Sequence, residues 1–223
     1  MKKLFRLPEM DDFVDYKKSI HLAIFTVYAL ILILVMTFSS NPMYLAYYVS
    51  TLMFFVLLYL FSKVLINDIK AFGKNFKRYL PFILVGFILC VFLNVLGGNI
   101  TAWIGAGDIP NQEAAESAFW QTPLLGAFAK VIVAPISEEL MFRRSIRVMV
   151  KNKVLYYLLS MFLFGMAHLI IGFTFPSSFA FIFLYALTGL GFAFVYDKSN
   201  NIWCAIFVHI LVNGLGVIML LVS

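Results

Sequence analysis

The sequence predicts an all-α protein, a polytopic membrane helix bundle of about seven transmembrane helices with a cytoplasmic N-terminus. Hydrophobic residues make up 63% of the 223 residues and charged residues only 13%, a balance far from that of soluble domains. Uncharged stretches recur at about the 20 residues that a helix needs to cross the hydrocarbon core. Basic segments alternate along the chain with uncharged or acidic ones, as membrane topology requires.

Each expected span except the fourth is an uncharged stretch bounded by charged or turn-forming residues. The stretch between Lys18 and Lys63 contains no charged residue and has room for two spans with a turn at SSNPM. The uncharged run from Val154 to Tyr196 divides at GFTFPSS into two more. The first apolar segment is too long for a signal-peptide core, so it is expected to remain as a span. The other expected spans are residues 80–96, about 118–142, and 201–221.

Basic residues precede the first span and lie between spans two and three and between spans four and five. The positive-inside rule therefore places the N-terminus in the cytoplasm and, with about seven spans, the C-terminus outside. We expect residues 1–18 to form a cytoplasmic basic segment and residues 19–223 a single transmembrane bundle with its motif-bearing core at about 118–223. Topology explains the net charge of +6, so the expected partner is the lipid bilayer and not nucleic acid.

Two adjacent glutamates, Glu138 and Glu139, lie inside the fourth expected span, just before a cluster of arginines. If Arg143 and Arg144 mark the cytoplasmic boundary, a rise of about 1.5 Å per residue places Glu138 roughly 7 to 8 Å inside the membrane. An ionisable group at that depth indicates a functional site. Glu139 and Arg143 are neighbours on one helical face and can pair, which leaves Glu138 for chemistry.

Two histidines lie at comparable depth on other expected helices. By the same rise per residue, His168 lies about 10 Å below the cytoplasmic surface and His209 about 12 to 14 Å. Asn213 follows His209 by one turn and shares its face. We therefore expect these three side chains and Glu138 to form one polar site that is reached from the cytoplasm. Packing histidines and an interfacial salt-bridge patch are the alternatives, but neither accounts for the matched depths.

Two further polar residues are expected to lie away from this site. His21 follows two lysines at the start of the first span, and we expect it to be an interfacial residue. Lys130 lies about 20 Å from the cytoplasmic boundary by the same rise per residue. It either extends to the outer surface or pairs within the bundle, and the sequence leaves both alternatives open.

Three short motifs carry a family resemblance. EELMFR fits the pattern EExxxR, FGMAH fits FxxxH and HILVN fits HxxxN, in this order and on separate expected helices. The chain thereby resembles the CPBP intramembrane proteases, the CAAX-processing and bacteriocin-processing enzymes also called the Abi family. The resemblance covers roughly the last hundred residues and implies a catalytic role for Glu138. It assigns the remaining motif positions to the same site: Glu139, Arg143, Phe164, His168, His209 and Asn213.

The residue types suit peptide hydrolysis independently of the resemblance. A carboxylate shielded from bulk water is suited to general-base work, so Glu138 with His168 could hold and activate a water molecule. His209 and Asn213 could then donate hydrogen bonds to the developing oxyanion. The alternative is a zinc site with Glu138, His168 and His209 as ligands. We favour a mechanism without a cofactor, because asparagine is a poor zinc ligand and no cysteine lies near the site.

Three functions are consistent with these features. The first is an intramembrane endopeptidase that cleaves a peptide or a membrane-associated protein from the cytoplasmic side. The second is a non-proteolytic immunity or scaffold protein of the same fold, although the retention of all three motifs disfavours it. The third is a small proton-coupled transporter, which has little support because the sequence contains no visible internal repeat. The Lys-, Ile-, Phe- and Asn-rich composition suggests a multi-pass protein of a bacterial plasma membrane.

Overall fold

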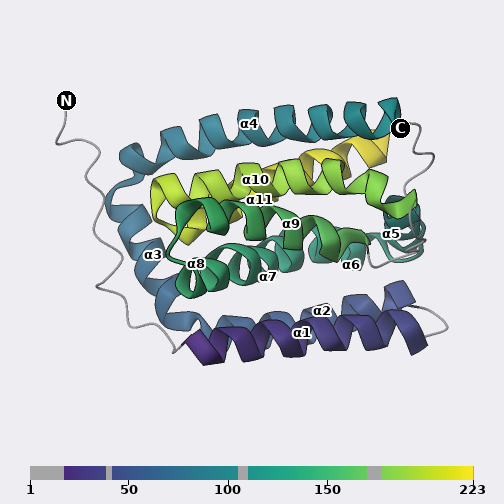
Figure 1. Ribbon diagram of the computed structural model, residues 1–223, viewed down its shortest axis with the longest axis horizontal. Helices are drawn as coiled ribbons and strands as arrows, with labels where there is room; N and C mark the ends of the chain where they lie inside the picture. Colours follow the sequence, from purple (N-terminus) through teal and green to yellow (C-terminus); the bar gives the residue numbers. More distant parts are fainter. Residues whose placement is uncertain (1–17, 39–41, 105–109, 170–176, 223) are drawn as a thin grey trace.

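The computed structural model describes residues 18–38, 42–104, 110–169 and 177–222, and every regular element within these ranges is a helix (Figure 1). The predicted all-α membrane bundle is confirmed. Residues 1–17 of the expected basic segment 1–18, and residues 39–41 of the expected turn SSNPM, lie outside the described residues. The elements are α1 Lys18–Phe38, α2 Pro42–Leu60, α3 Ser62–Lys74, α4 Phe76–Trp103, α5 Pro110–Gln121, α6 Pro123–Phe128, η2 Ala129–Val133, α7 Ala134–Glu139, η3 Leu140–Ser145, α8 Ile146–Met149, α9 Lys153–Leu169, η4 Ser177–Phe181, α10 Ile182–Ser199 and α11 Ile202–Val222.

Three helical segments in the described part of the chain are long and apolar enough to cross a membrane: α4, residues 179–199 with α10, and α11. A fourth span is possible if α2 and α3 count together, although they bend by 73° at residue 61. Residues 20–31 of α1 and helix α9 are apolar but shorter. The predicted count of seven spans and the external C-terminus stay predictions.

The structure extends one expected span and corrects one expected loop. The expected third span at residues 80–96 is part of a longer helix, α4, which begins at Phe76 and ends at Trp103. The acidic connection GAGDIPNQEAAES does not remain a loop, because α5 begins within it at Pro110. Proline is well suited to the first turn of a helix, where its missing N–H would have no partner. The residues of the expected fourth span, about 118–142, are divided between the end of α5 and the helical segments that begin at Pro123.

Helix α10 lies at the centre of the bundle, packed against α4 on one side and α9 on the other, with α11 beside it (Figure 1). Small residues allow this close packing. A Cβ atom added at Gly191 would lie 2.6 Å from the Cys90 Sγ atom of α4, which is closer than such contacts allow. The surrounding core is aromatic and aliphatic, and Tyr156, Phe192 and Ile206 are fully buried in it.

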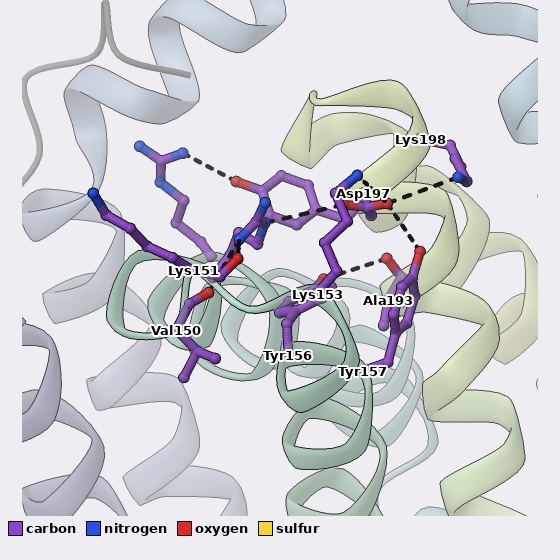
Figure 2. Close-up of polar contacts among 11 residues, drawn as sticks. Val150, Lys151, Lys153, Tyr156, Tyr157, Ala193, Asp197 and Lys198 are labelled. Carbon is purple, nitrogen blue, oxygen red and sulfur yellow. Dashed lines mark hydrogen bonds and ion pairs between the residues drawn. The ribbon is translucent and has the colours of Figure 1, made fainter. Parts of the chain in front are cut away.

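A polar cluster around Asp197 fixes α9 beside the C-terminal end of α10 (Figure 2). The Asp197 side chain is only 4% exposed, and it accepts a hydrogen bond of 3.0 Å from the Tyr157 hydroxyl. Lys153 Nζ lies 3.5 Å away and Arg147 Nε 4.0 Å away. The hydroxyl of Tyr156 donates to the Ala193 carbonyl one turn earlier on α10. These contacts hold α8, α9 and α10 together at one end of the bundle, and so set the register of α9.

Candidate active site

The two glutamates lie on α7, a short α-helical segment between two π-helical segments, η2 and η3. Pro135 on α7 has no N–H group, so it cannot donate to the carbonyl of Val131, four residues earlier. The loss of that bond helps to explain why the preceding turn, η2, is π-helical. Short π-helical turns within α-helices occur frequently at functional sites. Because π-helical turns lie on both sides of the glutamates, this part of the helix is a candidate functional site.

The predicted pair between Glu139 and Arg143 is confirmed. Arg143 Nε lies 3.1 Å from Glu139 Oε2, and both side chains are fully buried. The two atoms are close without the alignment of a hydrogen bond, so the attraction is that of an ion pair. The Arg143 guanidinium also lies over the rings of Phe164 at 4.5 Å and Phe192 at 5.4 Å. Breaking such a buried pair would leave a charge without compensation.

His209 lies between the two glutamates. Its Nδ1 atom is 2.9 Å from Glu139 Oε1, and its Nε2 atom is 3.7 Å from Glu138 Oε2. The first distance is a hydrogen bond, whereas the second is too long for one. The His209 ring stacks on Phe192 with centroids 4.1 Å apart. Helix α11 thus contributes an imidazole whose orientation is fixed by a carboxylate at one nitrogen and an aromatic face.

His168 lies on the other side of Phe164 from this arrangement. The Nδ1–H of His168 donates to the Phe164 carbonyl at 2.9 Å, and its ring stacks on Tyr185 with centroids 4.5 Å apart. Phe164 contacts both histidine rings, at 4.5 Å for His168 and 5.9 Å for His209. Within the described residues, no hydrogen bond or ion pair joins His168 to Glu138. The histidine whose ring approaches Glu138 directly is His209. That Glu138 and His168 hold a water molecule together stays a prediction.

Asn213 connects α11 to the π-helical turn before the glutamates. Its amide Nδ2 donates to the backbone carbonyl of Lys130 at 2.8 Å. Because an asparagine amide carries two hydrogens, one donor remains after this bond. The structure therefore brings Lys130 to the site through its carbonyl, a contact that the sequence did not predict.

His21 is not the interfacial residue that the sequence predicted. Its side chain is fully buried, and Nδ1 lies 3.0 Å from the Ser145 hydroxyl. Because that hydroxyl donates its own hydrogen to the Leu140 carbonyl, His21 is the donor in this pair. His21 lies at the start of the first span, as expected, but α8 and η3 pack against α1 and remove it from solvent. The contact ties α1 to the π-helical turn that carries Arg143.

Several buried polar atoms around the glutamates have no hydrogen-bond partner within the described part of the chain. They are Ser137 Oγ, Glu138 Oε2, Glu139 Oε2, Arg144 Nε and the three guanidinium nitrogens of Arg143. Buried polar groups are nearly always hydrogen-bonded to protein or to ordered water. A concentration of such atoms between residues 137 and 144 therefore marks a place suited to bound water or to a polar substrate group.

The side chains do not fit a zinc site in this arrangement. Among the described residues, no three His, Cys, Asp or Glu side chains are grouped so that they could hold a metal ion. A catalytic zinc requires three protein ligands that converge on one point. Glu138 and His209 approach each other, but His168 is directed to Tyr185 and the Phe164 carbonyl instead.

Two aromatic residues of the site were not predicted from the sequence. Phe192 supports both the Arg143 guanidinium and the His209 ring, and Tyr185 supports the His168 ring. Both lie within the long apolar run of α10, where nothing in the sequence separates them from other core residues. Phe164, which was predicted, contacts Gly189 of α10 so closely that an added Cβ would lie 2.8 Å from its ring.

The fold and the site define a multi-pass helical membrane protein with paired carboxylates and an imidazole inside the bundle. Residues 120–215 match the model of the family described as type II CAAX prenyl endopeptidase Rce1-like. The resemblance to CPBP proteases that the three motifs indicated is thereby confirmed, and the matched region contains all seven motif positions.

Bacterial proteins share sequence with this chain. It is 30% identical over 141 residues to "Putative membrane peptidase YdiL" of Bacillus subtilis, a match that covers 61% of this chain and 54% of the relative. It is 28% identical over 185 residues to an uncharacterized protein of Mycoplasma capricolum, covering 75% and 53%. It is also 28% identical over 156 residues to UPF0177 protein YajF of Lactococcus lactis, covering 66% and 72%. The chain thus spans about half the length of the first two relatives. No solved structure matches it significantly.

Proposed function

We propose that the protein is an intramembrane endopeptidase of the CPBP type that cleaves a peptide or a membrane-associated protein in a bacterial plasma membrane. One observation carries the proposal: Glu138, Glu139 and His209 meet inside a membrane bundle, in the region that matches a prenyl endopeptidase family. Glu138 keeps 16% of its side chain exposed, whereas Glu139 is fully buried. Glu138 is therefore the less buried of the two glutamates, and in this proposal it is the one that acts on water.

In the proposed reaction, Glu138 takes a proton from a water molecule as the water oxygen attacks the scissile carbonyl carbon. The carbonyl oxygen becomes an oxyanion in the tetrahedral intermediate. The C–N bond then breaks, and the proton held by Glu138 passes to the leaving amine. One water is consumed, and a new carboxyl end and a new amino end are formed. No step of this reaction uses a metal.

His209 is the proposed donor to the oxyanion. If Nδ1–H donates to Glu139, a protonated His209 directs its Nε2–H toward the side of Glu138, where the substrate carbonyl would lie. The Glu139 carboxylate, 2.9 Å from Nδ1, fixes the direction in which the His209 ring faces. The second amide hydrogen of Asn213 is the other proposed donor. Glu139 and Arg143 thus act by positioning His209, and Glu138 acts on the water.

His168 has a different proposed role from the one that the sequence suggested. Because its Nδ1–H donates to the Phe164 carbonyl, the neutral ring presents an unprotonated Nε2, which can only accept a hydrogen bond. Such an acceptor can bind an amide N–H of an extended substrate. We therefore propose that His168 orients the peptide, while His209 and Glu138 perform the chemistry.

The test is cleavage of an unbiased substrate pool. Purified wild-type protein and Glu138→Gln are each reconstituted in lipid vesicles and incubated with a membrane-extracted peptide pool, and new peptide termini are sequenced. We expect termini that appear with wild type and not with the variant. If no terminus depends on wild-type protein, or if both proteins give the same termini, the proposal is wrong.

A further inference from the structure

Helix α3 turns away from α2 and crosses one end of the bundle before α4 begins (Figure 1). One face of α3 is buried and carries Val64, Leu65, Asp68 and Phe72. The Phe72 ring contacts Phe207 of α11 at 5.2 Å. This face docks α3 onto the start of α11, the helix that carries His209.

Three hydrogen bonds form the joint between the two helices. The backbone N–H of Ile202, the first residue of α11, donates to Asp68 Oδ2 at 2.8 Å. The side-chain amide of Asn201 donates to the Asp68 carbonyl, and the indole N–H of Trp203 donates to the Leu65 carbonyl, each at 2.8 Å. The first N–H groups of a helix have no partner within it, and here Asp68 accepts from Ile202 while Asn201 Oδ1 accepts from the Trp203 N–H at 3.0 Å, so α3 completes the cap of α11.

The opposite face of α3 is basic and exposed. Lys63, Lys70 and Lys74 are seven and four residues apart, so at about 100° per residue they form one stripe only about 40° wide. The stripe points away from the buried face. Two exposed isoleucines, Ile66 and Ile69, flank it on one side. A surface helix with lysines beside exposed apolar residues is typical of segments that lie at the headgroup level of a membrane.

Within residues 62–78, no exposed acidic residue neutralises the lysine stripe of α3. Asp68 is the single acidic residue between positions 62 and 78, and it is turned inward and only 4% exposed. A second basic group at the same end of the bundle differs in this respect. There Lys153 and Lys198 lie within 4.0 Å of Asp197 (Figure 2). The lysine stripe of α3 is therefore the better binding surface for anions.

We propose that the exposed face of α3 binds anionic lipid headgroups and that its occupancy is transmitted to His209 through the joint with α11. Lysines near an anionic leaflet are attracted to it over about a Debye length. His209 lies seven residues after Ile202, which is two helical turns from the joint. A shift or a tightening of α3 therefore acts on the helix that positions the imidazole. The coupling to activity rests on the proposed function, whereas lipid binding does not.

Trp203 provides a reporter at the joint, because its indole donates directly to α3. The chain has three tryptophans, so Trp103→Phe with Trp120→Phe leaves Trp203 as the sole emitter. This protein is reconstituted in phosphatidylcholine vesicles with increasing phosphatidylglycerol. We measure Trp203 emission and, on the same samples, cleavage of any peptide identified in the pool experiment. The test variant is Lys63→Gln, Lys70→Gln, Lys74→Gln, and the matched control is Lys151→Gln, Lys153→Gln, Lys198→Gln.

We expect phosphatidylglycerol to shift Trp203 emission and to change cleavage about fivefold or more, in the range of ordinary coupling between sites. Both effects should be lost in the α3 variant, kept in the control variant and suppressed by high salt. An unchanged emission in wild type, or an equal response in both triple variants, overturns the proposal. Cleavage in pure phosphatidylcholine tests the proposed function separately, so an emission shift without any cleavage would contradict that function and leave lipid binding standing.

Discussion

The Nδ1 atom of His209 lies 2.9 Å from Oε1 of Glu139, although 70 residues separate them in the sequence. This contact gives the two adjacent glutamates different surroundings. Glu139 is occupied on one side by Arg143 and on the other by His209, whereas Glu138 has only the longer approach of 3.7 Å to the same ring. In the proposed mechanism, Glu139 therefore positions His209, and Glu138 acts on the water.

The two glutamates should respond differently to the same substitution. Glu138→Gln is expected to lower peptide cleavage by about a hundredfold or more while the protein stays folded, because a general base is lost. Glu139→Gln is expected to cost about 3 to 5 kcal/mol of stability, because Arg143 stays buried without its carboxylate. Thermal unfolding in detergent and cleavage rates measure both effects. Equal unfolding shifts with unimpaired cleavage in both variants would contradict the assignment.

Gly189→Ala tests the support of the site by Phe164. The added Cβ would lie 2.8 Å from Phe164 Cδ1 and 3.2 Å from its Cβ, so the whole side chain must move. We expect about 1 to 3 kcal/mol of destabilisation from overpacking and a fall in cleavage, since Phe164 supports Arg143 and both histidines. The control is Gly216→Ala, where nothing lies within 4 Å of the new atom. Similar losses in both variants would show that helix flexibility matters and Phe164 contact does not.

The sequence predicted those parts of the site that depend on spacing along one helix. The pair of Glu139 and Arg143 follows from a separation of four residues, and it was found as predicted. The contact of His209 with both glutamates depends on how α11 crosses α7, which periodicity does not determine. Phe192 could not be predicted, because it lies in an apolar run with no distinguishing neighbour. His21 was wrongly predicted because depth in a membrane does not specify whether protein or lipid surrounds a side chain.

The same limit applies to the fold. Long uncharged runs predicted α4, α10 and α11, since hydrocarbon requires apolar length. Helix α5 was missed because Glu113 and Glu116 suggested an exposed loop, although Pro110 at its start was an available signal. The bend of 73° before α3 was also missed. Basic residues after a span predict on which side of the membrane the segment lies, but not the direction in which its helix runs.

Asp68 predicts a specific pH dependence of stability. Burial raises its pKa from the usual 3.8 to about 6, against the lowering effects of the Ile202 hydrogen bond and the Arg144 charge. Folded protein then binds the Asp68 proton more tightly than unfolded protein. This group therefore favours folding most below about pH 4, and its contribution is lost as the pH rises through 6, by about 3 kcal/mol in all.

Asp68→Asn isolates this contribution, because an amide oxygen can still accept from Ile202 without a buried charge. The stability of Asp68→Asn relative to wild type should increase between pH 4 and 6 and level off above that range. Asp68→Ala removes the acceptor and should be less stable than Asp68→Asn at every pH. Thermal unfolding across this pH range provides the measurement. A difference between wild type and Asp68→Asn that stays constant with pH would contradict the raised pKa.

The choice between a metal-free and a zinc mechanism can be made with His209 and Asn213, which share one face of α11. If both donate to the oxyanion, Asn213→Ala should lower kcat by about 10² to 10³ with little change in KM, because its bond forms only as charge develops on the scissile oxygen. Asn94→Ala is a matched control, because it also removes an interhelical amide hydrogen bond, to Thr188 at 3.1 Å, away from the glutamates. Metal content, measured by elemental analysis, should be the same in wild type, Asn213→Ala and His209→Ala. Three results together would overturn the metal-free mechanism: wild type holds about one zinc per chain, His209→Ala loses both the zinc and the activity, and added zinc restores chelated wild type. The location of the site would be unaffected.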